Sequence, residues 1–268
     1  MTGSQQQSVK RAAVVTHGRD GVDEPLARLR TLAEAAGVEL HVDDEDAPLP
    51  DIAIVLGGDG TMLRALGRFL GTGVPVLGVN YGRVGFLTAL AGEQLEAGIN
   101  RVFAGEYRRI ELSTVEVTVG DTRRVAVNDV VVAGGTLGRM VELSYSIGGE
   151  ELGVQPCDGL ICASPAGSTA YNLSNGGPVL VWGIDAMVLT FVAPHTLHIR
   201  PLVVPRGIEV VVSNMTPDLE TTVLVDGHAV DRLPTGAHAT IHIAEQHSVL
   251  ATLPEVTFFK RYAATFGR

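Results

Sequence analysis

Three glycines surround one carboxylate in the segment Gly57-Gly58-Asp59-Gly60, where the residue types favour chemistry most clearly. Glycine has no Cβ, so a ligand backbone or a phosphate can approach the peptide N–H groups closely. The N-terminus of a following helix would favour an anion there. Asp59 itself would repel a phosphate, so its carboxylate is better suited to binding a hydroxyl group, to acting as a base, or to lying near a metal ion. A tight turn with Asp59 as a helix cap explains the same pattern, and the sequence alone leaves both open.

A second candidate is the segment at residues 158–171, in which an apolar run leads into small residues and a short helix. Ser168 or Thr169 can cap this helix, and the small side chains leave room for a planar ligand beside Tyr171. The alternative is a capped strand–helix turn with Tyr171 in the core. The residues around Ser168 do not form a GxSxG elbow, which argues against a serine hydrolase.

The third candidate is the polar pair Asn128-Asp129 inside the apolar run at residues 125–132. Adjacent strand residues face opposite sides, so at least one of the pair faces inward and needs a partner. A ligand would supply one, and so would a local bulge or structural hydrogen bonds. His195 and His198 are three residues apart without a third suitable ligand nearby, so we predict no metal site built from protein side chains.

The secondary structure that must position these residues differs between the two halves of the chain. Up to about residue 107, short apolar runs alternate with helical patterns, and the expected order is β-α-β-β-α-β. This order predicts an open α/β sheet, mostly parallel, in which ligands bind outside the carboxyl ends of the strands. The expected strands cover residues 12–17, 38–42, 52–56 and 74–79. The glycine loop directly follows the third of them, so it lies at a carboxyl end.

Beyond Tyr107, short alternating runs recur, and only residues 168–175 look helical. We therefore expect an all-β, mostly antiparallel domain built as a sandwich or prism-like stack. The expected organisation is an α/β domain over residues 1–107, a β-rich dinucleotide-binding domain over residues 108–253, and a return of residues 254–268 to the first domain. The expected strands of the β-rich domain include residues 114–119, 124–133, 140–147, 186–192, 208–213, 221–225 and 239–243.

The composition excludes several classes of protein. The formal net charge is −10, so no general attraction to nucleic acid is expected. Lys10 and Lys260 are the only lysines and neither follows a glycine-rich loop, which excludes a P-loop and disfavours protein kinase and Schiff-base chemistry. Cys157 and Cys162 fit neither a redox pair nor a zinc site, so buried thiols are expected. No apolar run is long enough for a membrane helix and the first ten residues lack a signal-peptide pattern, so we expect a cytoplasmic protein without membrane contact.

Taken together, the motifs closely resemble those of the NAD kinase family. The resemblance covers most of the chain. The GGDG segment alone is shared with lipid kinases, whereas GVNYGRVGFL together with GSTAY is far more specific. The matching segments are residues 57–61, 78–87, 128–129, 158–178 and, more weakly, 194–197 with 200–201.

The resemblance implies transfer of the terminal phosphoryl group of ATP or polyphosphate to the 2′-hydroxyl of the adenosine ribose of NAD, which gives NADP. Asp59 then resembles the base that accepts the hydroxyl proton, while the donor phosphates lie over Gly57, Gly58 and Gly60 with a divalent cation, Mg²⁺ by default. Arg64 and Arg139 are candidates for contacts with anionic groups. The residues that resemble dinucleotide contacts are Asn128, Asp129, Asp158, Thr169, Ala170, Tyr171, Asn172, Ser174, Ala193 and His228.

The resemblance also implies a homodimer or homotetramer, because the family assembles its sites from neighbouring subunits. Three positions depart from the family pattern: Ala166 replaces a frequent threonine, Asp129 a common glutamate, and Asn175 a small residue.

Two alternatives to an NAD kinase remain. A lipid or other small-molecule kinase could share the GGDG loop but should lack the second and third segments, and a dinucleotide-binding protein without turnover is disfavoured by the intact Asp59.

Overall fold

The computed structural model describes residues 8–16, 18, 21–81, 85–135, 139–196 and 198–267. It contains two compact units, one formed by residues 1–111 with 248–268 and the other by residues 112–247. Strands β6 (Arg108–Val119) and β17 (His238–Thr252) contribute to both units. The sequence suggests nearby boundaries, after residues 107 and 253.

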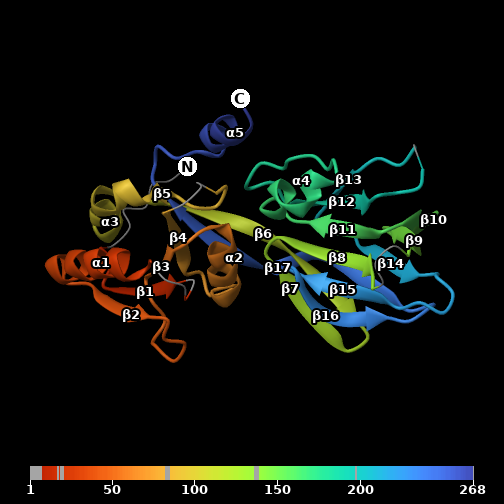
Figure 1. The fold of residues 1–268 in the computed structure, drawn as a ribbon, viewed down its shortest axis with the longest axis horizontal. Helices are drawn as coiled ribbons and strands as arrows, with labels where there is room; N and C mark the ends of the chain where they lie inside the picture. The colour runs from red at the N-terminus through yellow and green to blue at the C-terminus, as the bar shows by residue number, and fades with distance from the viewer. Residues whose placement is uncertain are drawn as a thin grey trace. The chain divides into compact units, whose positions relative to one another are not determined.

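The first unit contains a sheet in which the strands follow the order β2-β1-β3-β4 (Figure 1). The edge of β4 that faces away from β3 pairs with β5 and with the end of β17. Every pair among these strands is parallel, which confirms the expected open α/β sheet. The strands are β1 (Arg11–Thr16), β2 (Glu39–Val42), β3 (Ile52–Leu56), β4 (Pro75–Asn80) and β5 (Leu90–Ala91).

Helices cover both faces of this sheet (Figure 1). On one face, Ile54 shares a core with Leu29 of α1 and Ile99 of α3. On the other face, Met62 of α2 lies so close to Gly78 that a Cβ there would come within 2.6 Å of its sulfur. The sequence did not predict β5, α3 or α5. The helices of this unit are α1 (Asp23–Ala36), α2 (Asp59–Arg68), the 3₁₀ helix η1 (Gly92–Gln94), α3 (Leu95–Phe103) and α5 (Phe258–Phe266).

The second unit is a sandwich of antiparallel sheets, as expected. One sheet has the order β13-β12-β11-β8-β15-β16, and the other includes β10-β9-β14-β17 with β6 and β7. Inward side chains of both sheets form one core, to which β11 contributes Leu160, β9 contributes Leu143 and β17 contributes Ile241. The remaining elements are β7 (Thr122–Ala126), β8 (Asp129–Gly134), β9 (Val141–Ile147), β10 (Glu150–Cys157), β11 (Gly159–Ala163), η2 (Gly167–Thr169), α4 (Tyr171–Ser174), β12 (Ala186–Val192), β13 (Leu202–Pro205), β14 (Val210–Asn214), β15 (Thr221–Val225) and β16 (His228–Leu233).

One expected strand is wrong. The apolar run at residues 124–133 predicts a single strand, but β7 ends at Ala126 and β8 begins at Asp129, in different sheets. The chain leaves the ladder between them because the N–H groups of Val127 and Asn128 donate to the carboxylate of Asp226. The polar pair therefore marks a break between strands.

The two cysteines are free, buried thiols, in agreement with the sequence. Burial raises the pKa of Cys157 and of Cys162 to about 12, so neither is a ready nucleophile at neutral pH. In the described part of the chain, no helix combines the length and the apolar character needed to cross a membrane.

Candidate active site

The glycine loop joins β3 to α2 and exposes the start of that helix. Gly57 is buried, its N–H donates to the carbonyl of Val79, and a Cβ at this position would come within 2.7 Å of Oγ1 of Thr61. Gly58 is the N-cap residue, and its carbonyl accepts the first hydrogen bonds of α2. Asp59 is already inside the helix, so the alternative that it caps α2 is wrong.

The Asp59 carboxylate turns instead toward the GVNYGRVGFL segment at residues 78–87. Its Oδ2 accepts a hydrogen bond from the N–H of Phe86 at 2.7 Å, and its Oδ1 accepts one from the N–H of Leu87 at 3.1 Å. This approach requires Gly85, because a Cβ there would overlap the carboxylate. The GGDG and GVNYGRVGFL segments thus meet at one carboxylate, although residues 82–84 of the latter lie outside the described residues.

The strand order explains why this loop is suited to bind a ligand. The sheet extends from β1 to β2 in one direction and from β3 to β4 in the other, so the topology switches between β1 and β3. Open α/β sheets bind ligands at this point, outside the carboxyl ends of the strands. Asp59 follows β3, and the exposed Arg64 of α2 donates to the carbonyl of Thr16 at the end of β1. Asp59 and Arg64 therefore both lie at the carboxyl ends of the strands, beside this switch point.

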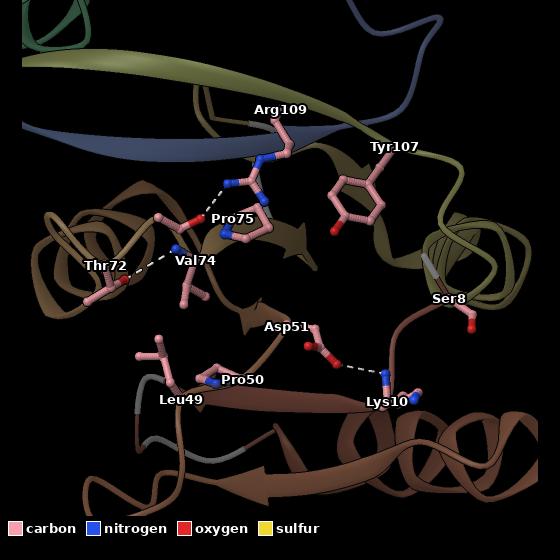
Figure 2. A pocket seen from close by; sticks show the side chains of 11 residues that line it. Ser8, Lys10, Leu49, Pro50, Asp51, Thr72, Val74, Pro75, Tyr107 and Arg109 are labelled. Atoms are coloured by element: carbon pink, nitrogen blue, oxygen red, sulfur yellow. Dashed lines mark hydrogen bonds between the residues drawn. The ribbon is translucent and has the colours of Figure 1, made fainter. Parts of the chain in front are cut away.

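Cavities of the first unit lie at both ends of the sheet. One of about 500 Å³ lies at the amino ends of the strands, where Lys10, Asp51 and Pro75 line it (Figure 2). Its lining among the described residues includes none of the predicted site residues. Another cavity, of about 410 Å³, is lined by Asn80 and Tyr81 at the carboxyl end of β4. The glycine loop follows β3 at the same end of the sheet.

In the second unit, the turn at Asn128-Asp129 is held by one acidic side chain. The carboxylate of Asp226 accepts hydrogen bonds from the N–H groups of Val127 at 2.9 Å, Asn128 at 2.7 Å and Asp129 at 3.2 Å. The hydroxyl of Ser164 donates to the carbonyl of Val127 at 2.6 Å. These bonds confirm that structural hydrogen bonds satisfy the backbone of the Asn128-Asp129 pair. They do not involve the side chains of the two residues.

The same turn brings two carboxyl groups into a buried environment. Burial raises the pKa of Asp129 to about 7, and the negative charge of Asp226 adds to the shift. Burial also raises the pKa of Asp226, while the three backbone N–H donors oppose that rise. The carboxyl group of Asp129 therefore changes its charge near neutral pH.

The loop after β11 presents some of its residues and buries others. Tyr171 is 46% exposed, so the alternative that it lies in the core is wrong. Neither hydroxyl caps α4: Ser168 bonds to the carbonyl of Pro165, and Thr169 to that of Ala166. Asn172 is fully buried.

The buried side chain of Asn172 ties the loop together. Its amide nitrogen donates to the carbonyls of Ser168 at 3.0 Å and Pro178 at 3.1 Å, and its oxygen accepts from the hydroxyl of Thr190 at 2.7 Å. A Cβ at Gly177 would overlap this side chain. The side chain of Asn172 thus supports the loop from behind and is not accessible to a ligand.

Most of the predicted dinucleotide contacts gather at one end of the sheet that contains β8. Asp129 begins β8 and pairs with Ala163, where the loop to α4 starts. Val225 pairs with Val130, so the turn that leads to the exposed His228 lies at the same end. We call this the Asn128 end, and it carries Asn128, Asp129, Thr169, Ala170, Tyr171, Asn172, Ser174 and His228.

Asp158, Ala193 and Arg139 lie at the opposite end, which we call the Asp158 end. The N–H of Asp158 donates to the carbonyl of Val192, and its carbonyl accepts from the N–H of Gly134, both at 3.0 Å. Ala193 has a φ of 45°, which is uncommon for a residue with a Cβ. A Cβ at Gly134 would lie 3.2 Å from the carbonyl of Arg139. The six residues of β8 separate the two ends, which is roughly 17–20 Å at the usual rise per residue.

Two residues that bind the backbone of predicted site segments, Asp226 and Arg261, are not among the site residues predicted from the sequence. Asp226 has a φ of 49°, and the dipeptide Asp226-Gly227 is a turn signal that could have directed attention to it. Arg261 on α5 donates to the backbone of the segment that binds Asp59. Nothing in the local sequence around Arg261 indicates this contact.

Known proteins resemble the chain over nearly its whole length. Residues 1–107 match the ATP-NAD kinase N-terminal domain, and residues 127–253 match the ATP-NAD kinase C-terminal domain. The NAD kinase of Gemmatimonas aurantiaca is 38% identical over 277 residues, covering 96% of each chain. That of Heliobacterium modesticaldum is 36% identical and covers 88% of this chain and 84% of the relative.

Solved structures show the same architecture. An NAD kinase from Archaeoglobus fulgidus in complex with ATP has a TM-score of 0.79 at 29% identity, covering 96% of this chain and 97% of that one. Yeast NADH kinase complexed with NADH shares the fold, with a TM-score of 0.85 at 20% identity, covering 98% of this chain and 89% of that one. Because both halves match, a kinase that shares only the GGDG loop is not supported, and the chain belongs to the NAD kinase family.

Proposed function

We propose that this protein transfers the terminal phosphoryl group of ATP to the 2′-hydroxyl of the adenosine ribose of NAD and so makes NADP. The observation that carries the proposal is the Asp59 carboxylate, which two backbone N–H groups hold at the switch point of the sheet. A carboxylate suits a hydroxyl proton, and the adjacent glycines and helix N-terminus suit phosphate. The family of the chain supports the identity of the acceptor and of the donor.

Asp59 acts as the general base in this reaction. The O–H bond of the 2′-hydroxyl breaks, and its proton passes to a carboxylate oxygen of Asp59. The freed oxygen forms a bond to the terminal phosphorus of ATP, whose bond to the bridging oxygen breaks to release ADP. Phosphoryl transfer depends mainly on positioning and charge stabilisation, so the N–H groups of Phe86 and Leu87 contribute by fixing the carboxylate.

We expect Mg²⁺ to accompany the donor phosphates. Magnesium sites of this kind use one or two carboxylates together with substrate phosphates, so a dedicated cluster of protein ligands is not required. The described residues contain no group of three or more His, Cys, Asp or Glu side chains that could hold a metal ion. The bound cation would neutralise phosphate charge.

The Asn128 end of the second unit is the proposed binding surface for the dinucleotide. Tyr171 and His228 are exposed there, and Thr169 and Ala170 are half-buried. Asn172 holds the loop behind them. The side-chain oxygen of Asn128 is buried without a hydrogen-bond partner among the described residues, so a ligand donor would satisfy it.

The separation of the predicted contacts supports a homo-oligomer. Asp158, Ala193 and Arg139 resemble dinucleotide or anion contacts, yet they lie at the other end of β8 from Asn128. A site that uses both groups is completed when a second copy of the chain brings its Asp158 end to the Asn128 end of the first. A homodimer or homotetramer is therefore the proposed active form, and an active species that is purely monomeric by light scattering would contradict it.

The replacement Asp59→Asn tests the base assignment. We expect kcat for NADP formation to fall by about 10²–10⁴-fold, the usual contribution of a general base. The matched control is Asp46→Asn, which removes one carboxylate from an exposed loop of the same unit. An Asp59→Asn enzyme that keeps more than about a tenth of the wild-type kcat would show that Asp59 is not the base.

One assay series tests the reaction, the acceptor and the donor together. NAD or NADH is supplied with ATP, GTP or inorganic polyphosphate, and NADP or NADPH is detected. We expect NADP from NAD and ATP. Absence of NADP and NADPH in every combination would contradict the proposed function.

A further inference from the structure

The position of the Asp59 carboxylate depends on a segment without regular secondary structure. Residues 85–87 lie outside every helix and strand, yet two of their N–H groups bind the carboxylate. In a helix or strand, neighbouring backbone bonds would fix the direction of these donors. Here other contacts must fix them, and whatever holds residues 85–87 also determines where the carboxylate points.

Arg261 of α5 holds the opposite side of the same peptide groups. Its Nη1 donates to the carbonyl of Phe86 at 3.0 Å and to that of Gly85 at 3.4 Å. The side chain is only 8% exposed. Burial lowers the pKa of Arg261 to about 10 and the negative charge of Asp59 opposes this lowering, so the guanidinium stays charged at neutral pH.

The same helix also packs against the side chain of Phe86. The ring of Phe258 meets it edge-on, with the ring centroids 5.3 Å apart, and the ring of Phe266 lies at 6.0 Å. Aromatic pairs at these distances are attractive and directional. Helix α5 therefore contacts both the backbone carbonyl and the ring of Phe86. The N–H of Phe86 binds Asp59.

We propose that Arg261 is a positioning residue for phosphoryl transfer, because it fixes the backbone of residues 85–86 that aims the Asp59 carboxylate at the acceptor hydroxyl. The inference rests on the proposed function, which assigns Asp59 the role of base. Arg261 acts through the peptide groups and needs no contact with substrate. Its loss should therefore lower kcat and leave the binding of NAD, which uses the second unit, nearly unchanged.

The kinetic test compares three variants of the full chain. Arg261→Met removes the donor, Arg261→Lys keeps one charged donor, and Lys260→Met removes a positive charge from an exposed position of the same helix. Misplacement of a reacting group by about 1 Å can lower a rate by about 100-fold, so we expect kcat to fall roughly 10- to 100-fold in Arg261→Met. Arg261→Lys should recover part of the loss, Lys260→Met should match the wild type, and KM for NAD should stay within about twofold in all three.

Hydrogen exchange gives a second readout that does not depend on activity. We expect the N–H groups of Phe86 and Leu87 to exchange at least about tenfold faster in Arg261→Met, while the N–H groups of β3 keep their rates. If the wild type makes no NADP, the proposed function fails and this measurement still tests the contact. If Arg261→Met does not fold, Arg261→Lys replaces it in both measurements. Unchanged kcat and unchanged exchange in a folded variant would overturn the inference.

Discussion

Replacing Asp129 by asparagine should make the second unit more stable at high pH. Burial, reinforced by the charge of Asp226, raises the pKa of Asp129 from its ordinary value of 3.8 to about 7. Between these two values the unfolded chain releases the proton while the folded unit keeps it. The contribution of Asp129 to the free energy of unfolding therefore falls as pH rises from about 4 to about 7 and is constant above that range. Asparagine carries no such proton, so the variant escapes this loss.

The size of the effect follows from the shift in pKa. One unit corresponds to about 1.4 kcal/mol, so the advantage of Asp129→Asn over the wild type should grow by about 3 kcal/mol between pH 5 and pH 8. For a unit of this size, that corresponds to a change of roughly 10 °C in the difference between the two melting temperatures. The side chain is only 7% exposed, so solvent screens the effect little.

Calorimetry at several pH values measures this difference, and ¹³C NMR of the Asp129 carboxyl group measures its titration directly. The control is Asp121→Asn, which removes a carboxylate from an exposed turn of the same unit and should show no comparable trend. A difference between Asp129→Asn and the wild type that stays constant from pH 5 to pH 8 would refute the reasoning. So would an NMR midpoint near pH 4.

Three further changes test the geometry of the site. Gly85→Ala places a Cβ on the Asp59 carboxylate, so kcat should fall about 100-fold, whereas Gly67→Ala in the exposed last turn of α2 should keep activity and raise the melting temperature slightly; equal kcat values would contradict this. Asp226→Asn replaces one of the two acceptor oxygens for the N–H groups of the Asn128 turn by a donor, so KM for NAD should rise about tenfold and stability should fall by about 1–3 kcal/mol in kinetic and unfolding assays. Mixing and reassembling inactive Asp158→Ala and Asn128→Ala oligomers should restore part of the activity, because some sites would then contain two intact ends; no recovery in proven mixed oligomers would argue against shared sites.

Local sequence explains the glycine loop but not its partners. An apolar run, three glycines and an amphipathic pattern lie within twenty residues, and this local order predicts the strand, loop and helix around Asp59. The hydrogen bonds from Phe86 and Leu87 join residues 27 and 28 positions away, and no periodicity encodes such a contact. The motif that contains these residues could be singled out, whereas the role of its backbone required the structure.

The second unit shows where a hydrophobic pattern misleads. Residues 124–133 are mostly apolar, so the pattern continues across the point where the chain changes sheets. The break at Asn128 is set by Asp226, which is 98 residues away in sequence. A single acidic residue that acts on backbone N–H groups leaves no repeating signal, and the same holds for Arg261, which acts on backbone carbonyls.

The division of the first unit into two stretches of chain affects the order in which it is completed during synthesis. Residues 1–111 leave the ribosome first, but α5 follows only after the whole second unit has been made. At usual rates of translation, the delay is on the order of ten seconds. Throughout this interval Gly85 and Phe86 exist without the helix that binds their carbonyl groups. A nascent chain can thus pair strands β1 to β5 early, while the segment that binds the Asp59 carboxylate gains its final support only when the last helix has emerged.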